Sequence, residues 1–95
     1  MVKIIWNDLA LEDLKSVRDF TAKDSVFYAN RFIEKIIKRV DQLGNFPRSG
    51  RIVPEFGIDS IRELIEGNYR IVYKIFDDHI VIVRIHHAAR FLNPF

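Results

Sequence analysis

The sequence predicts an α+β domain in which a helical hairpin packs on a mostly antiparallel, four-stranded sheet. One observation is a long segment in the first half whose apolar residues recur every three or four positions, the spacing of a buried helix face. The other is a β-rich second half that two turn signals, Gly67-Asn68 and Asp77-Asp78, divide into strands. Strands joined by such tight turns pair antiparallel. With a strand at the N-terminus, the predicted order is β-α-α-β-β-β.

Length and composition limit the class of protein. The 95 residues predict a single domain over 1–95. The chain has no cysteine, which excludes a disulfide framework and a cysteine-based zinc site and favours a reducing compartment. No apolar run approaches the ~20 residues of a membrane span, and no signal-peptide pattern is present, so we expect a cytoplasmic protein without membrane contact. A net charge of +2 permits contact with nucleic acid without requiring it.

The N-terminal part predicts a strand and a first helix. Residues 2–6 alternate weakly between apolar and polar, which indicates a short strand. Asn7 suits a helix N-cap, and the helix that follows is expected over 8–21. Trp6 is most simply a core residue.

The second helix has the clearest pattern in the chain. Its apolar spacing extends over 25–43, with Asp24 as the candidate N-cap. Gly44 is expected to end the helix in a left-handed conformation. Phe27 and Phe32 are most simply assigned to the core. The two helices are expected to form an antiparallel hairpin.

The second half predicts a loop and three strands. The loop is expected over 45–60, and the strands over 61–66, 69–76 and 79–86. If Asp77-Asp78 is a two-residue turn, side chains of the last hairpin divide between two faces. The face expected beneath the helices carries Tyr69, Ile71, Tyr73, Ile75, Ile80, Ile82, Arg84 and His86. The opposite face, expected to be half open, carries Arg70, Val72, Lys74, Phe76, Val81, Val83, Ile85 and His87. An open apolar face of this kind suggests a partner that covers it.

Arginines on the predicted sheet need water, an ion-pair partner or an anionic target. For Arg70 a structural alternative is an ion pair with Glu63 or Glu66 across a strand. If the basic side chains cluster, they can bind RNA or an acidic protein; otherwise they are solvated charge. The set comprises Arg48, Arg51, Arg62, Arg84 and Arg90.

The histidines provide candidates for proton transfer. His86 and His87 are adjacent on a strand, so their side chains should point to opposite faces. One of them is a candidate general base, and the alternative is a histidine hydrogen-bonded at a strand end. His79 lies at the other end of the hairpin, and no spacing resembles a ligand set. We therefore expect no metal and no cofactor.

Several motifs together resemble the RelE/ParE superfamily of type II toxin–antitoxin toxins, over nearly the whole chain. They are the Phe46-Pro47-Arg48-Ser49-Gly50-Arg51 loop, Arg62-Glu63-Leu64, the strand Tyr69-Arg70-Ile71-Val72-Tyr73, and Arg84-Ile85-His86-His87-Ala88-Ala89-Arg90. The last motif is similar to the ParE-type ending, His-Gly-Ala-Arg, with Ala88 in place of glycine. The resemblance implies the β-α-α-β-β-β fold and a toxin that a cognate antitoxin neutralises.

The superfamily implies two alternative activities. RelE-like members cleave mRNA in the ribosomal A site, without a metal. In that case Arg70 and Arg90 match the phosphate-binding arginines, and His87 or Glu55 would move protons. ParE-like members inhibit DNA gyrase and have no known catalytic residues. This sequence lacks the lysines and the terminal tyrosine of the RelE-type site, which favours the gyrase inhibitor. A member that only binds its antitoxin is a third alternative.

The resemblance also implies the partners. They are the antitoxin, with DNA gyrase as the favoured target and the ribosome with mRNA as the alternative. A complex of toxin and antitoxin can bind DNA through the antitoxin. The residues expected to contact the target or the antitoxin are Arg62, Lys74, Arg84, His86 and Arg90.

Overall fold

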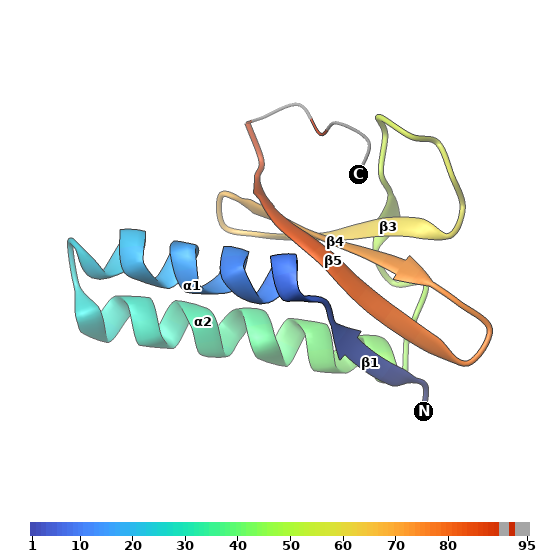
Figure 1. Cartoon of the computed structure of the whole chain (residues 1–95), viewed down its shortest axis with the longest axis horizontal. Coiled ribbons are helices and arrows are strands. Elements are labelled where there is room, and N and C mark those ends of the chain that lie inside the picture. Colours follow the sequence, from blue (N-terminus) through green and yellow to red (C-terminus); the bar gives the residue numbers. More distant parts are fainter. Residues whose placement is uncertain (90–91, 93–95) are drawn as a thin grey trace.

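The computed structural model describes residues 1–89 and 92, and it confirms the predicted fold class. Two helices pack on a five-stranded sheet of order β1-β5-β4-β3-β2 (Figure 1). Neighbouring strands are antiparallel except for β1 and β5, which run parallel. The elements are β1 (Lys3–Trp6), α1 (Asp8–Ala22), α2 (Val26–Asp41), a 3₁₀ turn (Gln42–Gly44), β2 (Arg51–Ile52), β3 (Ile61–Glu66), β4 (Tyr69–Ile75) and β5 (His79–His87).

The predicted count of four strands is wrong by one. The additional strand, β2, lies in the segment predicted as loop, and its two residues pair with Arg62 and Glu63 of β3. A strand this short has no periodicity to detect. It can be recognised as a strand only from its pairing with β3 in the structure.

The helix boundaries follow from their caps. The Asn7 side chain accepts a hydrogen bond from the Ala10 N–H at 2.8 Å, which confirms the first N-cap. The second N-cap is Ser25 rather than Asp24, because Ser25 is extended and its hydroxyl accepts from the Tyr28 N–H at 3.1 Å. The prediction for Gly44 is also wrong. The chain tightens into a 3₁₀ turn there, and the described glycines with positive φ are Gly57 and Gly67.

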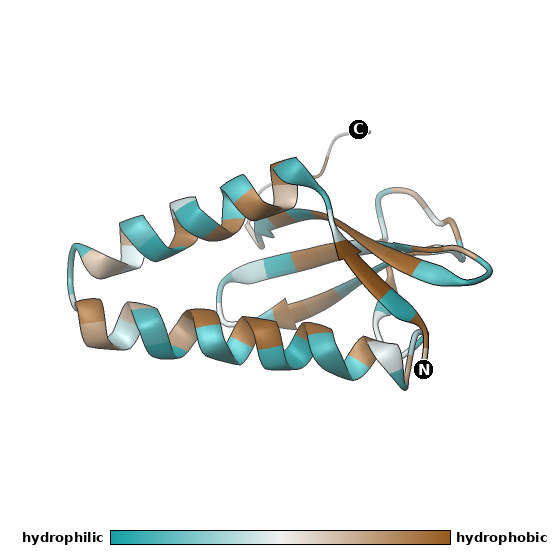
Figure 2. Ribbon diagram, turned by 60° about the horizontal axis from the view of Figure 1, so that its bottom comes forward, coloured by the Kyte–Doolittle hydropathy of each residue, from teal (hydrophilic) through white to brown (hydrophobic). Residues whose placement is uncertain are grey.

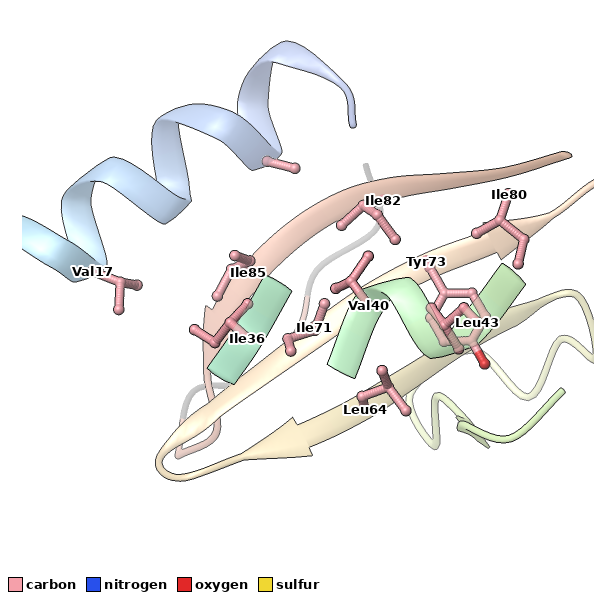
Figure 3. Packing of buried hydrophobic residues seen from close by; sticks show 11 residues of the cluster. Val17, Ile36, Val40, Leu43, Leu64, Ile71, Tyr73, Ile80, Ile82 and Ile85 are labelled. Atoms are coloured by element: carbon pink, nitrogen blue, oxygen red, sulfur yellow. The ribbon is translucent and has the colours of Figure 1, made fainter. Parts of the chain in front are cut away.

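The main core lies between the helices and one face of the sheet (Figure 3). Its buried members are Ala10, Val17, Ile36, Val40, Leu43, Leu64, Ile71, Tyr73, Ile80, Ile82 and Ile85. Trp6 and Phe32 pack against this cluster while partly exposed. Phe27, predicted as core, is instead 73% exposed. It lies on the outer side of α2, outside the spacing that the buried residues Ala29, Ile36 and Val40 follow.

A β-bulge changes the predicted faces of β5. The register pairs Tyr73 with Ile82 but Val72 with Arg84, so one residue of β5 has no direct partner between them. This extra residue reverses the alternation beyond it. Ile85 therefore joins Ile71 in the main core, and Arg84 leaves the face to which it was assigned. The predicted faces of the two histidines are exchanged as well: His86 lies opposite Arg70, and His87 lies opposite Tyr69.

The opposite face of the sheet was predicted to be half open, but the area around Val72 is covered. A second buried cluster of Val53, Val72 and Leu92 covers it, and Phe56, Ile61 and Val83 pack against that cluster. The segment between β2 and β3 folds back over the sheet and supplies Val53 and Phe56 (Figure 1). Neither described helix has the combination of length and apolarity needed to cross a membrane.

Candidate functional site

Arg70 is the centre of a charged network on the covered face of the sheet. It belongs to β4, and only 5% of its surface is exposed. Its Nη1 and Nη2 atoms donate to the two carboxylate oxygens of Glu55 at 2.5 and 2.6 Å. Its Nε donates to Glu63 Oε1 at 2.7 Å. This two-pronged geometry is the strongest form of an arginine–carboxylate pair.

Glu63 links Arg70 to a second arginine. Its other oxygen, Oε2, accepts from Arg51 Nε at 2.6 Å, while its side chain is fully buried. Two arginines and two carboxylates thus neutralise each other beside the middle of β3. The structure bears out the alternative in which Arg70 pairs with Glu63. Glu66 instead pairs with Lys35 and Arg39 of α2, at 3.4 and 3.2 Å.

The network fixes the protonation state of Glu55. The hydrogen bonds from Arg70 lower the pKa of Glu55 from 4.5 to about 2, with a further contribution from the Leu92 N–H, against the opposing effect of burial. The Leu92 N–H donates to Glu55 Oε2 at 2.9 Å. The pKa of Arg70 is raised, mainly by its hydrogen bonds with Glu55. A carboxylate with so low a pKa is a weak proton acceptor at neutral pH.

The adjacent histidines lie on opposite faces, as predicted. His86 is directly opposite Arg70 in the register, so the two share a face. His87 is opposite Tyr69, and its ring meets the Tyr69 ring edge-on at 5.6 Å between centroids. The structure therefore brings Arg70 and Glu55 together but places His87 across the sheet from them. Arg90, the fourth candidate catalytic residue, lies outside the described residues.

The other basic candidates have partners within the chain. Arg62 donates to the backbone oxygens of Asp59, Arg48 and Gly50 at 3.0–3.1 Å, and its Nη2 pairs with the Asp59 carboxylate. Arg48 pairs with the same carboxylate. Lys74 lies over the Phe76 ring, 5.1 Å from its centroid.

Arg84 connects the bulged strand to α1. Its Nε and Nη2 donate to the Asp13 carboxylate at 2.8 and 3.2 Å, and this pair raises the pKa of Arg84. Asp13 also accepts the Ile85 N–H at 2.9 Å. The pair therefore stabilises the backbone beside the bulge, which is a structural task that the sequence did not indicate.

The Phe46–Arg51 loop is held by a residue that sequence reasoning did not assign to it. The Tyr73 hydroxyl donates to the Pro47 carbonyl at 2.8 Å and accepts from the Gly50 N–H at 2.9 Å. Figure 3 shows Tyr73 among the core side chains, with its hydroxyl at the edge of the cluster. A Cβ at Gly50 would lie 2.6 Å from both the Tyr73 hydroxyl and the Glu63 carbonyl, so this close approach requires glycine. The motif thus has a structural role.

Within residues 1–89 and 92, no three acidic, histidine or cysteine side chains gather in the arrangement that a metal ion needs. The charged network around Arg70 pairs carboxylates with guanidinium groups. Because each of these carboxylates is paired with a guanidinium group, the network has no excess of negative charge that would attract a cation.

Comparisons with known proteins agree on one family. The model of the ParE toxin of type II toxin–antitoxin systems matches residues 4–91. Toxin RelE2 of Caulobacter vibrioides is 34% identical over 91 residues, which cover 95% of this chain and 99% of that protein. The two comparisons carry names from both branches of the superfamily.

Solved structures have the same fold. The chromosomal ParDE toxin–antitoxin system of P. aeruginosa contains a chain with a TM-score of 0.75 and 20% identity, covering 92% of this chain and 96% of that one. The RelBE2 toxin–antitoxin complex of Mycobacterium tuberculosis contains another, with a TM-score of 0.67 and 20% identity, covering 90% and 96%. Because the family model spans nearly all of its residues, this chain belongs to the ParE toxin family of type II toxin–antitoxin systems, within the RelE/ParE superfamily.

Proposed function

We propose that this toxin acts by binding DNA gyrase, without breaking a bond, and that a small cognate antitoxin neutralises it in the cytoplasm. The observation that carries the proposal is the two-pronged ion pair between Arg70 and Glu55. In a nuclease of the RelE type, Arg70 would stabilise charge on a phosphate. Here its guanidinium is buried and bound by two carboxylates of the same chain.

The placement of the proton-transfer candidates supports the same conclusion. Cleavage of RNA through the 2′-hydroxyl needs a base and an acid close to the phosphate-binding cation. Glu55 is held ionised by Arg70, with a pKa of about 2, and His87 lies on the other face of the sheet. The arrangement around Arg70 therefore fits a structural network better than a site for acid–base catalysis.

The antitoxin is proposed from family membership and from the surface of the chain. Both structural relatives named above are toxin–antitoxin systems. Large apolar side chains stay exposed on the helical hairpin of this protein, Phe20, Phe27 and Tyr28 among them. An exposed aromatic surface of this kind is typical of a protein that spends its time in a complex.

Two assays in parallel test the proposal. Purified toxin is added to a DNA supercoiling reaction with gyrase and, separately, to ribosomes programmed with a defined mRNA. We expect loss of supercoiling and intact mRNA. Cleavage of the mRNA with unaffected supercoiling would contradict the proposal, and no effect in either assay would indicate a protein that only binds its antitoxin.

The alternative is a ribosome-dependent endoribonuclease. It is favoured by the name of the 34% identical relative, Toxin RelE2, and by the match of Arg70 to the RelE-type arginine. For Arg70 to reach a phosphate, its bonds with Glu55 would have to break, and the phosphate would have to replace that carboxylate. This exchange is what the mRNA assay examines.

A further inference from the structure

One end of the sheet is open on the face turned away from the helices. Among the described residues, the cover over that face centres on Val72 and extends to Ile61 and Val83. Figures 1 and 2 place the β4–β5 turn and the start of β1 at the end of the molecule opposite the α1–α2 connection. We call the sheet surface beside this turn the open sheet end and define it by Lys3, Ile5, Lys74, Phe76, His79 and Val81.

The strand register places these residues side by side. Ile5 is directly opposite Val81 on β5, and Val81 is directly opposite Lys74 on β4. Lys3 is opposite His79 in the same way. Residues that oppose each other on neighbouring strands share a face. This face is the one turned away from the helices, because the residues that alternate with Lys3 and Ile5 on β1 pack against the main core.

The apolar side chains of the open sheet end are accessible to another molecule. Ile5 is 38% exposed and Phe76 is 39% exposed, and Val81 is half-buried between them. The Phe76 ring is stacked on the His79 ring, with 4.6 Å between their centroids. Phe76 also lines a hollow of about 670 Å³, together with the exposed ring of Phe46. A hollow beside an exposed aromatic ring can receive an apolar side chain of a partner.

The open sheet end also carries the lysines of the sheet. The arginines of the sheet each pair with a carboxylate of the same chain: Arg51, Arg62, Arg70 and Arg84. In the described part of the chain, neither Lys3 nor Lys74 forms such an ion pair. The Lys74 amine lies over the Phe76 ring instead. The positive charge that the sheet offers to a partner therefore lies beside its exposed apolar side chains.

We propose that the toxin binds gyrase through the open sheet end, and that the gyrase segment it meets combines apolar side chains with carboxylates. The apolar side chains pack on Ile5, Val81 and Phe76, and the carboxylates pair with Lys3 and Lys74. The inference rests on the proposed function. It adds where on this chain the target binds and what chemistry the target presents.

A protein surface fits the open sheet end better than the DNA that gyrase holds. Two lysines can neutralise few phosphates, and the affinity for a nucleic acid backbone grows with the number neutralised. Asp77 and Asp78 are exposed in the turn beside His79, where they repel phosphate. The Phe76 ring already contacts His79 and Lys74, which leaves less of it for a base to stack on.

The open sheet end is remote from the aromatic side chains that we assign to the antitoxin. Phe20 and Phe27 flank the α1–α2 connection, which lies at the other end of the molecule (Figure 1). Substitutions at the open sheet end should therefore weaken the binding of gyrase and leave the binding of the antitoxin intact.

The test compares charge reversal at the open sheet end with an equal reversal on the helices. Lys3→Glu/Lys74→Glu alters the open sheet end, and Lys15→Glu/Lys38→Glu, at two exposed lysines of α1 and α2, is the control. A third variant, Lys3→Gln/Lys74→Gln, removes the two charges without adding repulsion and decides the question if the reversal unfolds the protein. Each variant is titrated into a supercoiling reaction with gyrase. Its affinity for the purified antitoxin, the small protein encoded beside this chain, is measured by calorimetry.

We expect the concentration for half-inhibition of gyrase to rise about tenfold or more in the reversal, about threefold or more in the glutamine variant and about twofold or less in the control. Both variants of the open sheet end should keep their affinity for the antitoxin. Equal weakening in the control, or unchanged inhibition by both variants of the open sheet end, would overturn the location of the site. A parallel loss of antitoxin affinity would overturn its assignment to gyrase.

Two further results separate the remaining alternatives. Duplex DNA without gyrase is the probe for a nucleic acid site. If the unaltered toxin binds this DNA and both variants of the open sheet end do not, the choice of a protein surface is overturned. If the unaltered toxin binds the antitoxin but does not inhibit gyrase, the proposed function fails together with this inference, whereas inhibition that persists in the variants overturns the location alone.

Discussion

Arg70 and Glu55 form a two-pronged ion pair on the covered face of the sheet, 15 residues apart in the sequence, with Nη–O distances of 2.5 and 2.6 Å. The pair joins a central strand to the segment that covers it. Glu55 also accepts the Leu92 N–H, so the same carboxylate connects a third part of the chain. This explains why a buried arginine and a loop glutamate occur together in a protein for which we propose no catalysis.

Replacing Arg70 should destabilise the fold severely. Arg70→Ala leaves Glu55 and Glu63 without their shared cation on a buried face, and breaking one side of a buried ion pair costs about 3–5 kcal/mol. Urea denaturation measures the loss. Arg31→Ala, an exposed arginine on α2, is the matched control and should cost about 0.5 kcal/mol or less. A similar small cost for Arg70→Ala would show that the network is dispensable.

Stability should fall in acid through Glu55. Its pKa is lower in the folded chain, about 2, than the usual 4.5, so its contribution is complete above pH 4.5 and is lost as the pH falls towards 2. Glu55→Gln removes this contribution. The difference in unfolding free energy between the native protein and the variant should therefore shrink between pH 4.5 and 2. A difference independent of pH over that range would contradict the assignment.

The Tyr73 hydroxyl should contribute to stability through the loop that it holds. Tyr73→Phe leaves the Pro47 carbonyl and the Gly50 N–H without their partner, and such a loss costs about 1–3 kcal/mol when the groups are buried. Hydrogen exchange should report faster opening at Gly50. Tyr28→Phe, which removes a hydroxyl from a 59% exposed residue, serves as the control and should leave both measurements unchanged.

The contacts of Asp13 and Arg84 predict unequal effects. Asp13→Ala removes the acceptor for both Arg84 and the Ile85 N–H, whereas Arg84→Ala leaves the backbone hydrogen bond in place. The first variant should therefore lose more unfolding free energy than the second. Chemical denaturation of both variants and of the double variant measures the order. Equal losses would mean that the Ile85 hydrogen bond adds nothing.

Local patterns predicted the helices and the last three strands well. The apolar spacing of α2 and the cap at Asn7 depend on neighbours within one turn of helix, so a single sequence contains what is needed. The pairing of Arg70 with Glu63 was also foreseeable, because tight turns place the two strands side by side.

The failures concern features without a local signal. One bulged residue opposite the Val72–Tyr73 step reversed the faces of Ile85 and Arg84, and no residue type marks that position. The covered sheet face depends on a segment that folds back from Val53 onwards, and its contacts join parts far apart in the sequence. For the same reason the pair of Arg70 and Glu55 was not predicted, although both residues were singled out.

The most direct measurement is induced expression of this chain alone, with the cells scored for filamentation and the SOS response and with mRNA examined for cleavage in the ribosomal A site. If the toxin inhibits gyrase by binding, the cells should form filaments, induce the SOS response and keep their mRNA intact. Rapid arrest of translation with A-site cleavage would contradict this account. It would require Arg70 to leave Glu55 and act on a phosphate.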